Sequence, residues 1–476
     1  MRKLFFAILC LFITLSLSSH PWKPRHYVII DTDGGIDDMR AITLMLASPD
    51  VRVLAITVSP GSLTAGEAYV KVKSLLNSYY HEGIPVGINR TSKFKSPEFP
   101  VALNTKWGNE TGLDEKTAPD HTELVNQILS AEKTKITFIC LGSMSTAASV
   151  IKEVPIFKKQ VKQIIWSVSG PDEKEGFNYK ADLQAAENVL KNDIDLKMVR
   201  GLEAEQFYTE SLLKQISELK NSYAQKISGF FSPESAANHK FSYTGYDEMV
   251  PLFLHYPGLF EMNSDIKNPI FTPSKIDSLK LISVRILSGN IIERNQVIRA
   301  LPVSPGFYLE DIEPFVTEII GKHGIDEWTS GVIANELHRH LGVFAIIGVK
   351  MGIRAREYFN TGVDEFIAVS FAGSMPPLSC MNDGIQVSTG ATAGHGLLTV
   401  RNDVPTVASV EFTYLDRKIR LTLKPEIAEK VSSELKEINF IHGLDSDIYW
   451  ELVRKNSIKY WRDLDRHEIF KIEEIK

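Results

Sequence analysis

The stretch Tyr27–Asp38 (YVIIDTDGGIDD) decides the fold of the N-terminal half of this 476-residue chain. It consists of a short apolar run that ends in acid, two glycines that permit a tight turn, and the start of a helical spacing at Ile36. Strand-like and helical segments then alternate along the chain. This order predicts an α/β fold, with a mostly parallel sheet and flanking helices. Ligands bind beyond the carboxyl ends of the strands in such sheets, so the acidic turn is the first candidate site.

Four carboxylates crowd this turn, and they belong to Asp31, Asp33, Asp37 and Asp38. A helix start favours negative charge, which explains one or two aspartates in a solvated turn. It does not explain four, because like charges this close repel unless a cation lies among them. Hard oxygen ligands suit Ca²⁺ or Mg²⁺. The loop therefore predicts a metal site.

The loop resembles the N-terminal signature Asp-x-Asp-Pro-Gly-x-Asp-Asp of the inosine/uridine-preferring nucleoside hydrolases, with Gly34 in place of Pro. Three later segments resemble further motifs of that family in the same order, namely Gly142–Thr146, Gly176–Ala186 and Tyr246–Phe260. The four matches cover residues 25–320, which we take as the first domain. The resemblance implies hydrolysis of the N-glycosidic bond of a nucleoside or a related ribosyl compound, which releases base and ribose.

The resemblance also implies roles for individual residues. Ca²⁺ would be held by Asp33, Asp38, Asp247 and the backbone carbonyl of Ser145. Asp33 would take a proton from the attacking water, whose pKa the cation lowers. Asp37 and Asn178 would hydrogen-bond the ribose hydroxyls, and Asp31 would support the loop. A ring of carboxylates near the sugar suits an oxocarbenium-like transition state, which develops positive charge.

Three positions depart from the family pattern. Tyr246 stands where the family often has His, and a phenol, with a pKa near 10, donates a hydrogen bond but is a weak acid. Gly61 stands in place of an Asn near the ribose, and Gly176 in place of a Glu. The implied metal ligands are kept while the sugar and base contacts are fewer. Tyr246 is our candidate for activating the leaving base, and a ribosyl-binding protein that keeps the Ca²⁺ site is the alternative to an enzyme.

A lower-ranked alternative comes from the Asp-x-Asp-Gly pattern at the start of the loop. Haloacid-dehalogenase-like phosphatases begin in this way after a strand, with Asp31 as the nucleophile and Asp33 as the acid. Those enzymes do not need Asp37 and Asp38, nor the later motifs. The phosphatase interpretation therefore explains less of the sequence.

The second domain, residues 322–476, contains a different set of candidate ligands. Glu336–Gly342 (ELHRHLG) places two histidines at i and i+2, which share a metal only near a helix end or a turn. The passages Ser379–Val387 and Thr389–Gly396 are rich in glycine and polar residues. Tight turns with ordinary histidines explain these features equally well.

The same passages resemble the FmdE-like domain, in which Gly342 replaces one family Cys and Ala391 another. The resemblance implies an α+β domain that binds a transition metal. Mixed His and Cys ligands suit Zn²⁺. The implied ligands are His338, His340, Cys380 and Asp383, with His395 in reserve.

The first nineteen residues are typical of a signal peptide. Arg2 and Lys3 precede the apolar run Leu4–Leu17, which is too short to span a bilayer and is followed by small residues. We therefore expect export to the periplasm or the medium, with no stable membrane span after cleavage at about residue 19. The mature chain would keep Cys140 and Cys380, both expected as free thiols.

Composition limits the partners. Hydrophobic residues make up 43% and charged residues 24% of the chain, as in ordinary globular proteins. The net charge of −6 gives no electrostatic footprint for nucleic acid. The expected partner is a small-molecule nucleoside or ribosyl substrate, and the resemblance adds self-association of the chain as an expectation.

Overall fold

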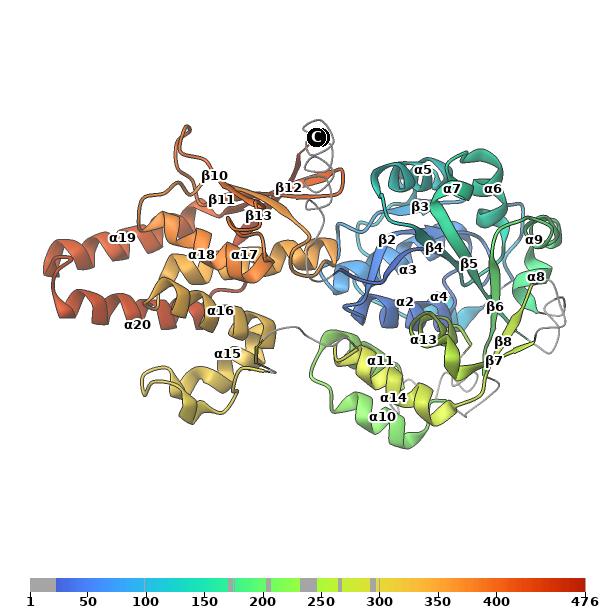
Figure 1. Cartoon of the computed structure of the whole chain (residues 1–476), viewed down its shortest axis with the longest axis horizontal. Helices are drawn as coiled ribbons and strands as arrows, with labels where there is room; N and C mark the ends of the chain where they lie inside the picture. Colours follow the sequence, from blue (N-terminus) through green and yellow to red (C-terminus); the bar gives the residue numbers. More distant parts are fainter. Residues whose placement is uncertain are drawn as a thin grey trace, which may run out of the picture.

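The computed structural model describes residues 23–97, 99–169, 174, 176–202, 207–231, 246–263, 268–291, 297–298 and 300–475, so the predicted signal peptide lies outside the described residues. Each of the two lobes contains one sheet (Figure 1). Within these residues, no helix has both the length and the apolar character needed to cross a membrane.

The N-terminal lobe is built on an eight-stranded sheet in the order β3-β2-β1-β4-β5-β6-β8-β7. Its neighbouring strands are parallel except for the pair β7 and β8. The predicted mostly parallel α/β fold is therefore confirmed. The strands are β1 (His26–Thr32), β2 (Val51–Val58), β3 (Val86–Ile88), β4 (Ile136–Cys140), β5 (Val161–Val168), β6 (Leu196–Arg200), β7 (Phe260–Asn263) and β8 (Ile270–Pro273).

Helices cover this sheet, with α2 and α3 near β1 and β2 and with α5, α6 and α7 grouped together (Figure 1). The helices of the lobe are α2 (Ile36–Ala47), α3 (Ala65–Ser78), α4 (Pro100–Asn104), η1 (Glu115–Thr117), α5 (His121–Ala131), α6 (Ser145–Glu153), α7 (Phe157–Gln160), α8 (Phe177–Ala181), α9 (Leu183–Leu190), α10 (Glu210–Ser217), α11 (Ser222–Phe230), α13 (Met249–His255), η3 (Pro257–Leu259) and α14 (Ile276–Leu287).

Local sequence explains where these elements begin. Every residue of β2 is buried, as expected of a parallel strand that is covered on both faces. Gly34 has φ +79° in the turn between β1 and α2, a conformation that glycine adopts without strain. Thr64 and Glu67 form a capping box at the start of α3. Asp182, from the third family-like segment, caps α9 by accepting the backbone N–H of Ala185.

The C-terminal lobe contains a five-stranded sheet in the order β10-β9-β11-β12-β13, in which only β9 and β10 are parallel. The predicted second α+β unit is confirmed. Its strands are β9 (Ile367–Ser370), β10 (Leu398–Val400), β11 (Ser409–Tyr414), β12 (Arg417–Leu423) and β13 (Phe470–Ile475). Its helices are η4 (Pro305–Phe307), η5 (Glu313–Phe315), α15 (Val316–His323), α16 (Ile325–His338), α17 (Val343–Phe359), η6 (Leu378–Cys380), α18 (Met381–Thr389), α19 (Pro425–His442) and α20 (Asp447–Asp463).

Two regions of this lobe contain elements that the sequence pattern alone does not indicate. The glycine- and polar-rich passage around Asp383 contains the helix α18, which packs closely on α17 through Gly384 and Gly348. The charged end of the chain contains the strands β12 and β13 besides its two helices. The burial of β12 alternates along the strand, so only one of its faces reaches the core.

The segment before residue 320 packs on the C-terminal lobe. Ile312, Val316 and Ile319 join one apolar cluster with Trp328 and Trp461. Ile312 lies directly before η5, and Val316 and Ile319 belong to α15. The boundary at about 320 remains a prediction, and these contacts group residues 312–319 with the second lobe.

The two lobes also contact each other directly. Arg52 on β2 forms an ion pair with Glu365, at 2.6 Å and with both side chains largely buried. The backbone N–H of Gly83 donates to the Tyr358 carbonyl at 2.9 Å. The Tyr80 and His467 rings stack with centroids 3.5 Å apart.

Candidate metal centre and active site

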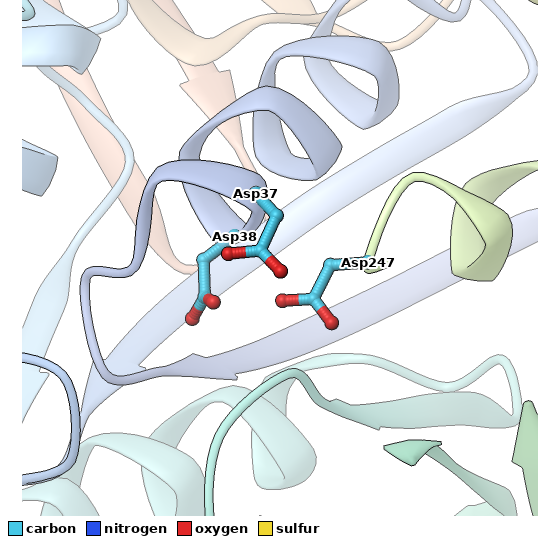
Figure 2. A group of neighbouring side chains, drawn as sticks. All are labelled: Asp37, Asp38 and Asp247. Carbon is cyan, nitrogen blue, oxygen red and sulfur yellow. The ribbon is translucent and has the colours of Figure 1, made fainter. Parts of the chain in front are cut away.

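Three aspartates converge where β1 ends and two helices begin. Asp37 and Asp38 lie in the first turn of α2, and Asp247 lies just before α13. Figure 2 shows the carboxylates of Asp37 and Asp247 facing each other, with the Asp38 carboxylate next to that of Asp37. One oxygen from each lies within 4.8 Å of the others, which is close enough for a single cation to bridge them. The site lies at the carboxyl end of a parallel strand, where this fold class binds ligands.

Hydroxyl groups from two strands fix these carboxylates. Thr32 donates to Asp38 Oδ2 at 2.5 Å, and the backbone N–H of Asp33 donates to the same oxygen at 3.0 Å. Ser167, near the end of β5, donates a short hydrogen bond to Asp247 Oδ1. Thr32 and Ser167 are not among the predicted site residues, although a hydroxyl at the carboxyl end of a strand next to the acidic motif is a usable signal.

Burial and mutual repulsion raise the pKa values of this group. Burial raises the pKa of Asp37 to about 7, and the neighbouring charges of Asp38 and Glu248 add to the effect. Burial also raises the pKa of Asp247 above its usual range, followed by repulsion from Asp37 and Asp38. A bound divalent cation would offset this repulsion and lower the pKa of the aspartates, because a nearby positive charge favours the ionised carboxylate.

Asp33 is buried beside this group, but its carboxylate is not one of the three that converge. Its Oδ1 accepts the backbone N–H of Gly35 at 3.1 Å. Burial, followed by repulsion from Asp38, raises the pKa of Asp33 well above its usual range. A buried carboxylate of this kind is a stronger proton acceptor than an exposed one once it is ionised.

Asp31 lies fully buried behind the loop. Thr57 and Ser59 donate to its two carboxylate oxygens at 2.7 and 2.9 Å. Burial raises the pKa of Asp31 to about 7, even though these hydroxyl groups stabilise the charged form. The side chain therefore links β1 to β2 beneath the acidic turn.

The remaining predicted residues border the same end of the sheet. Ser145 is the first residue of α6 and is buried, with its hydroxyl 3.0 Å from that of Ser143. The Asn178 amide donates to the Leu141 carbonyl at 2.6 Å. Tyr246 directly precedes Asp247, and its ring lies against Gly201, where an added Cβ would come within 2.3 Å of Tyr246 Cδ1.

His338 and His340 of the C-terminal lobe meet at a helix end. His338 is the last residue of α16, and Arg339 follows in the left-handed conformation with φ 68°. This bend places the ring centroids of His338 and His340 4.2 Å apart. Two histidines at i and i+2 come this close only at a helix end or a turn, as expected from the sequence. His338 Nδ1 lies 2.7 Å from Asp383 Oδ2, and His338 Nε2 is buried with no hydrogen-bond partner among the described residues.

The other predicted ligands of this lobe lie less close together. Among the described residues, only the aspartates Asp37, Asp38 and Asp247 form a group of three or more converging ligands, and the four C-terminal candidates do not. Burial, followed by the charge of Asp383, raises the pKa of the Cys380 thiol to about 11. His395 Nδ1 lies 3.2 Å from the Gly390 carbonyl. Cys380 and Cys140 are both free, which confirms the expectation for the two thiols.

Comparison with known families identifies both parts of the chain. Residues 28–270, more than half of the chain, match the model of the inosine-uridine preferring nucleoside hydrolases, and the chain belongs to that family. Residues 337–447 match a second model, described as FmdE, molybdenum formylmethanofuran dehydrogenase operon. The protein therefore joins a nucleoside hydrolase domain to an FmdE-like domain, as the sequence motifs predicted.

Individual relatives are distant and match only in part. A probable uridine nucleosidase 1 from Oryza sativa subsp. japonica is 24% identical over 215 residues, which are 42% of this chain and 66% of the relative. The pyrimidine-specific ribonucleoside hydrolase RihA of Klebsiella pneumoniae (strain 342) is 27% identical over 185 residues, or 36% and 58% of the two chains. The chain thus spans about 58–66% of the length of these curated relatives.

Solved structures of similar proteins share little sequence with this chain. An inosine-uridine preferring nucleoside hydrolase from Bacillus anthracis is 17% identical with a TM-score of 0.44. A plant nucleoside hydrolase is 20% identical with a TM-score of 0.46. Each comparison covers 56% of this chain and 99% of the other.

Proposed function

We propose that this protein hydrolyses the N-glycosidic bond of a ribonucleoside, or of a related ribosyl compound, with the help of bound Ca²⁺. The convergence of Asp37, Asp38 and Asp247 at the carboxyl end of the sheet carries the proposal. Membership of the nucleoside hydrolase family supports the reaction type.

The donor set fits the cation. All of the converging atoms are carboxylate oxygens, which Ca²⁺ and Mg²⁺ prefer. Asp38 and Asp247 belong both to this group and to the ligand set that the motifs imply, so we assign them as the principal ligands. Asp33 and the Ser145 carbonyl complete the set implied by the motifs. When bound, a divalent cation lowers the pKa of a nearby water and offsets the negative charge of the aspartates.

The residues around the cation would divide the chemistry among them. Asp33 takes a proton from the attacking water, because burial raises its pKa and so makes its ionised carboxylate a stronger base than an exposed one. Asp37 and Asn178 hold the ribose hydroxyls. The surrounding carboxylates stabilise the positive charge that develops on the ribose as the glycosidic bond breaks. Tyr246 donates a hydrogen bond to the leaving base.

The base preference of the proposed hydrolase is best tested first with pyrimidine nucleosides. Two relatives with partial similarity are a probable uridine nucleosidase and a pyrimidine-specific ribonucleoside hydrolase. Uridine is therefore the first substrate to test, followed by cytidine, inosine and adenosine.

The test is release of ribose by the purified mature protein, with Ca²⁺ and after chelation. We expect release that chelation abolishes, and we expect Asp33→Ala to abolish it as well. Asp277→Ala, at a fully exposed position of α14, is the matched control and leaves turnover unchanged. Full activity of Asp33→Ala would contradict the assigned base. Ca²⁺ binding with ribose-competitive ligand binding and no product would favour the binding-protein alternative, and metal-dependent release of phosphate from p-nitrophenyl phosphate would favour the phosphatase.

We further propose that the C-terminal lobe binds Zn²⁺ at His338 and His340. The buried Nε2 of His338 lacks a partner among the described residues, which suits a ligand nitrogen. A Cβ added at Gly342 would lie 3.2 Å from His338 Nε2 and 3.5 Å from His340 Nε2, so both nitrogens border the place of the missing Cys. Asp383 then orients His338 through Nδ1, as carboxylates often do for metal-bound histidines. Cys380 is the remaining candidate ligand.

We propose export to the periplasm or the medium, with removal of residues 1–19. The basic and apolar start of the chain supports this proposal. N-terminal sequencing of the protein recovered outside the cytoplasm tests it, and an intact Met1 would contradict it. Self-association of the chain remains an expectation that gel filtration can check. The absence of nucleic-acid binding is a second expectation, which a DNA-binding assay can check.

A further inference from the structure

We propose that the buried ion pair between Arg40 and Glu248 is a positioning device for the metal centre, which holds the first turn of α2, with Asp38, at the separation from Asp247 that a cation needs. This inference rests on the proposed Ca²⁺ site and adds two residues to it. Arg40 lies outside the motifs that predicted the site, and Glu248 lies within the segment Tyr246–Phe260 but had no role assigned to it.

The pair joins the two segments that carry the converging carboxylates. Arg40 lies on α2, three residues after Asp37, so the two side chains share one face of that helix. Glu248 directly follows Asp247 and precedes the first residue of α13. The Arg40 Nε donates a short hydrogen bond to Glu248 Oε1. Any shift between α2 and the start of α13 would break this bond.

The surroundings of the pair exclude water. The Arg40 and Glu248 side chains are 1% and 0% exposed. Tyr208 donates to the same Glu248 oxygen at 2.9 Å. The guanidinium lies 5.3–5.5 Å from the ring centres of Tyr208, Phe230 and Phe231. Because a buried charge without its partner is strongly unfavourable, this environment permits only the paired arrangement.

The pair acts by geometry more than by charge. Repulsion from Glu248 raises the pKa of Asp37, while attraction from Arg40 lowers it. The two charges therefore act on Asp37 in opposite directions. Metal ligands, in contrast, must be held within a fraction of an ångström of their working positions. A rigid link between the two backbones meets that requirement.

The C-terminal lobe offers a matched control. Lys350 on α17 and Glu327 on α16 form an ion pair at 2.5 Å in which both side chains are 0% exposed. This pair also joins two helices, but neither residue is next to a converging aspartate in the sequence. Its loss should therefore reproduce the general cost of breaking a buried ion pair, without an effect on the metal.

The experiment compares Arg40→Met with Lys350→Met in the full-length mature protein. Calorimetric titration with CaCl₂ gives the metal affinity, and thermal unfolding without metal gives the stability. We expect both variants to unfold at lower temperature. We expect only Arg40→Met to weaken Ca²⁺ binding, by at least tenfold, while Lys350→Met stays within twofold of the wild type.

Glu248→Gln is a milder second variant, for use if Arg40→Met does not fold. It keeps the shape of the side chain and the oxygen that accepts the hydrogen bond. We expect it to weaken Ca²⁺ binding severalfold. A purely electrostatic role for Arg40 predicts the opposite result, because removing a cation near the site would tighten binding. Wild-type or tighter affinity in the folded Arg40→Met or Glu248→Gln protein would overturn the inference alone. A wild-type protein that binds no Ca²⁺ would overturn the proposed metal function together with it.

Discussion

The Asp33 carboxylate lies directly against Gly61, so closely that a Cβ on Gly61 would stand 2.1 Å from Asp33 Oδ2. Gly142 borders the other side of the same carboxylate, where an added Cβ would lie 3.1 Å from Asp33 Cβ. In the family pattern, Gly61 replaces an Asn near the ribose, which indicates the loss of a ribose contact. The structure gives it a local role, because only glycine leaves room for Asp33 in this position.

We therefore expect Gly61→Ala to displace Asp33 and to lower kcat by about 100-fold, the cost that a misplacement of about 1 Å has in other active sites. Nucleoside hydrolysis under saturating substrate measures the effect. Gly258→Ala is the control, since an added Cβ there meets nothing within 4 Å. Equal activity of the two variants would show that the Asp33 position does not limit turnover.

Tyr246→Phe should slow substrates whose base leaves poorly. Loss of a proton or hydrogen-bond donor at the leaving group costs about 100-fold or more. A riboside with a p-nitrophenol leaving group needs no such help, so its hydrolysis should stay near the wild-type rate. Steady-state kinetics on uridine and on this riboside make the comparison. An equal loss on both substrates would assign Tyr246 a structural role through its packing on Gly201.

Gly342→Cys should tighten Zn²⁺ binding by the C-terminal lobe about 100-fold or more, because a thiolate joins the two imidazoles at the hollow that they border. Competition with a chelator of known Zn²⁺ affinity measures the change. Adding His338→Ala to this variant should remove most of the gain. Unchanged affinity in Gly342→Cys would mean that the two Nε2 atoms do not face a common metal position.

Stability should fall as the pH drops through the range set by His81. Burial lowers the pKa of His81 to about 4. One ring nitrogen contacts the Tyr223 hydroxyl within the N-terminal lobe, and the other contacts the Glu357 carbonyl of the C-terminal lobe. Histidine in the unfolded chain has a pKa near 6.5, so below this pH the unfolded chain binds a proton that the folded protein does not bind at His81. The stabilisation is complete above about pH 6.5 and is lost toward pH 4, by roughly 3 kcal/mol at the limit.

Thermal unfolding at pH 7.5 and pH 5 tests this expectation. His81→Gln removes the titrating group, so its unfolding temperature should fall less between the two pH values than that of the wild type. His26, whose pKa burial also lowers to about 4, still contributes in both proteins. An identical fall in the two proteins would exclude His81 as a source of the pH dependence.

Much of the fold was readable from the chain because its signals are local. The apolar run before Asp31, the glycine turn and the helical spacing after Ile36 predict β1 and α2, and both form where expected. The exceptions are α18, β12 and β13. Glycine or charged residues interrupt the apolar pattern of these elements in the sequence. Their buried faces form only when another element packs on them.

The sequence by itself determined the two-part organisation, the parallel sheet and the presence of an acidic loop, since strand, turn and helix preferences act over a few residues. Only the tertiary structure decided which carboxylates meet. Asp247 reaches Asp37 and Asp38 across more than two hundred residues, and Arg40 meets Glu248 over the same span. Nothing in the local sequence of Arg40 distinguishes it from a solvated helix residue. Its role arises because folding buries it beside a carboxylate, where water can no longer satisfy either charge.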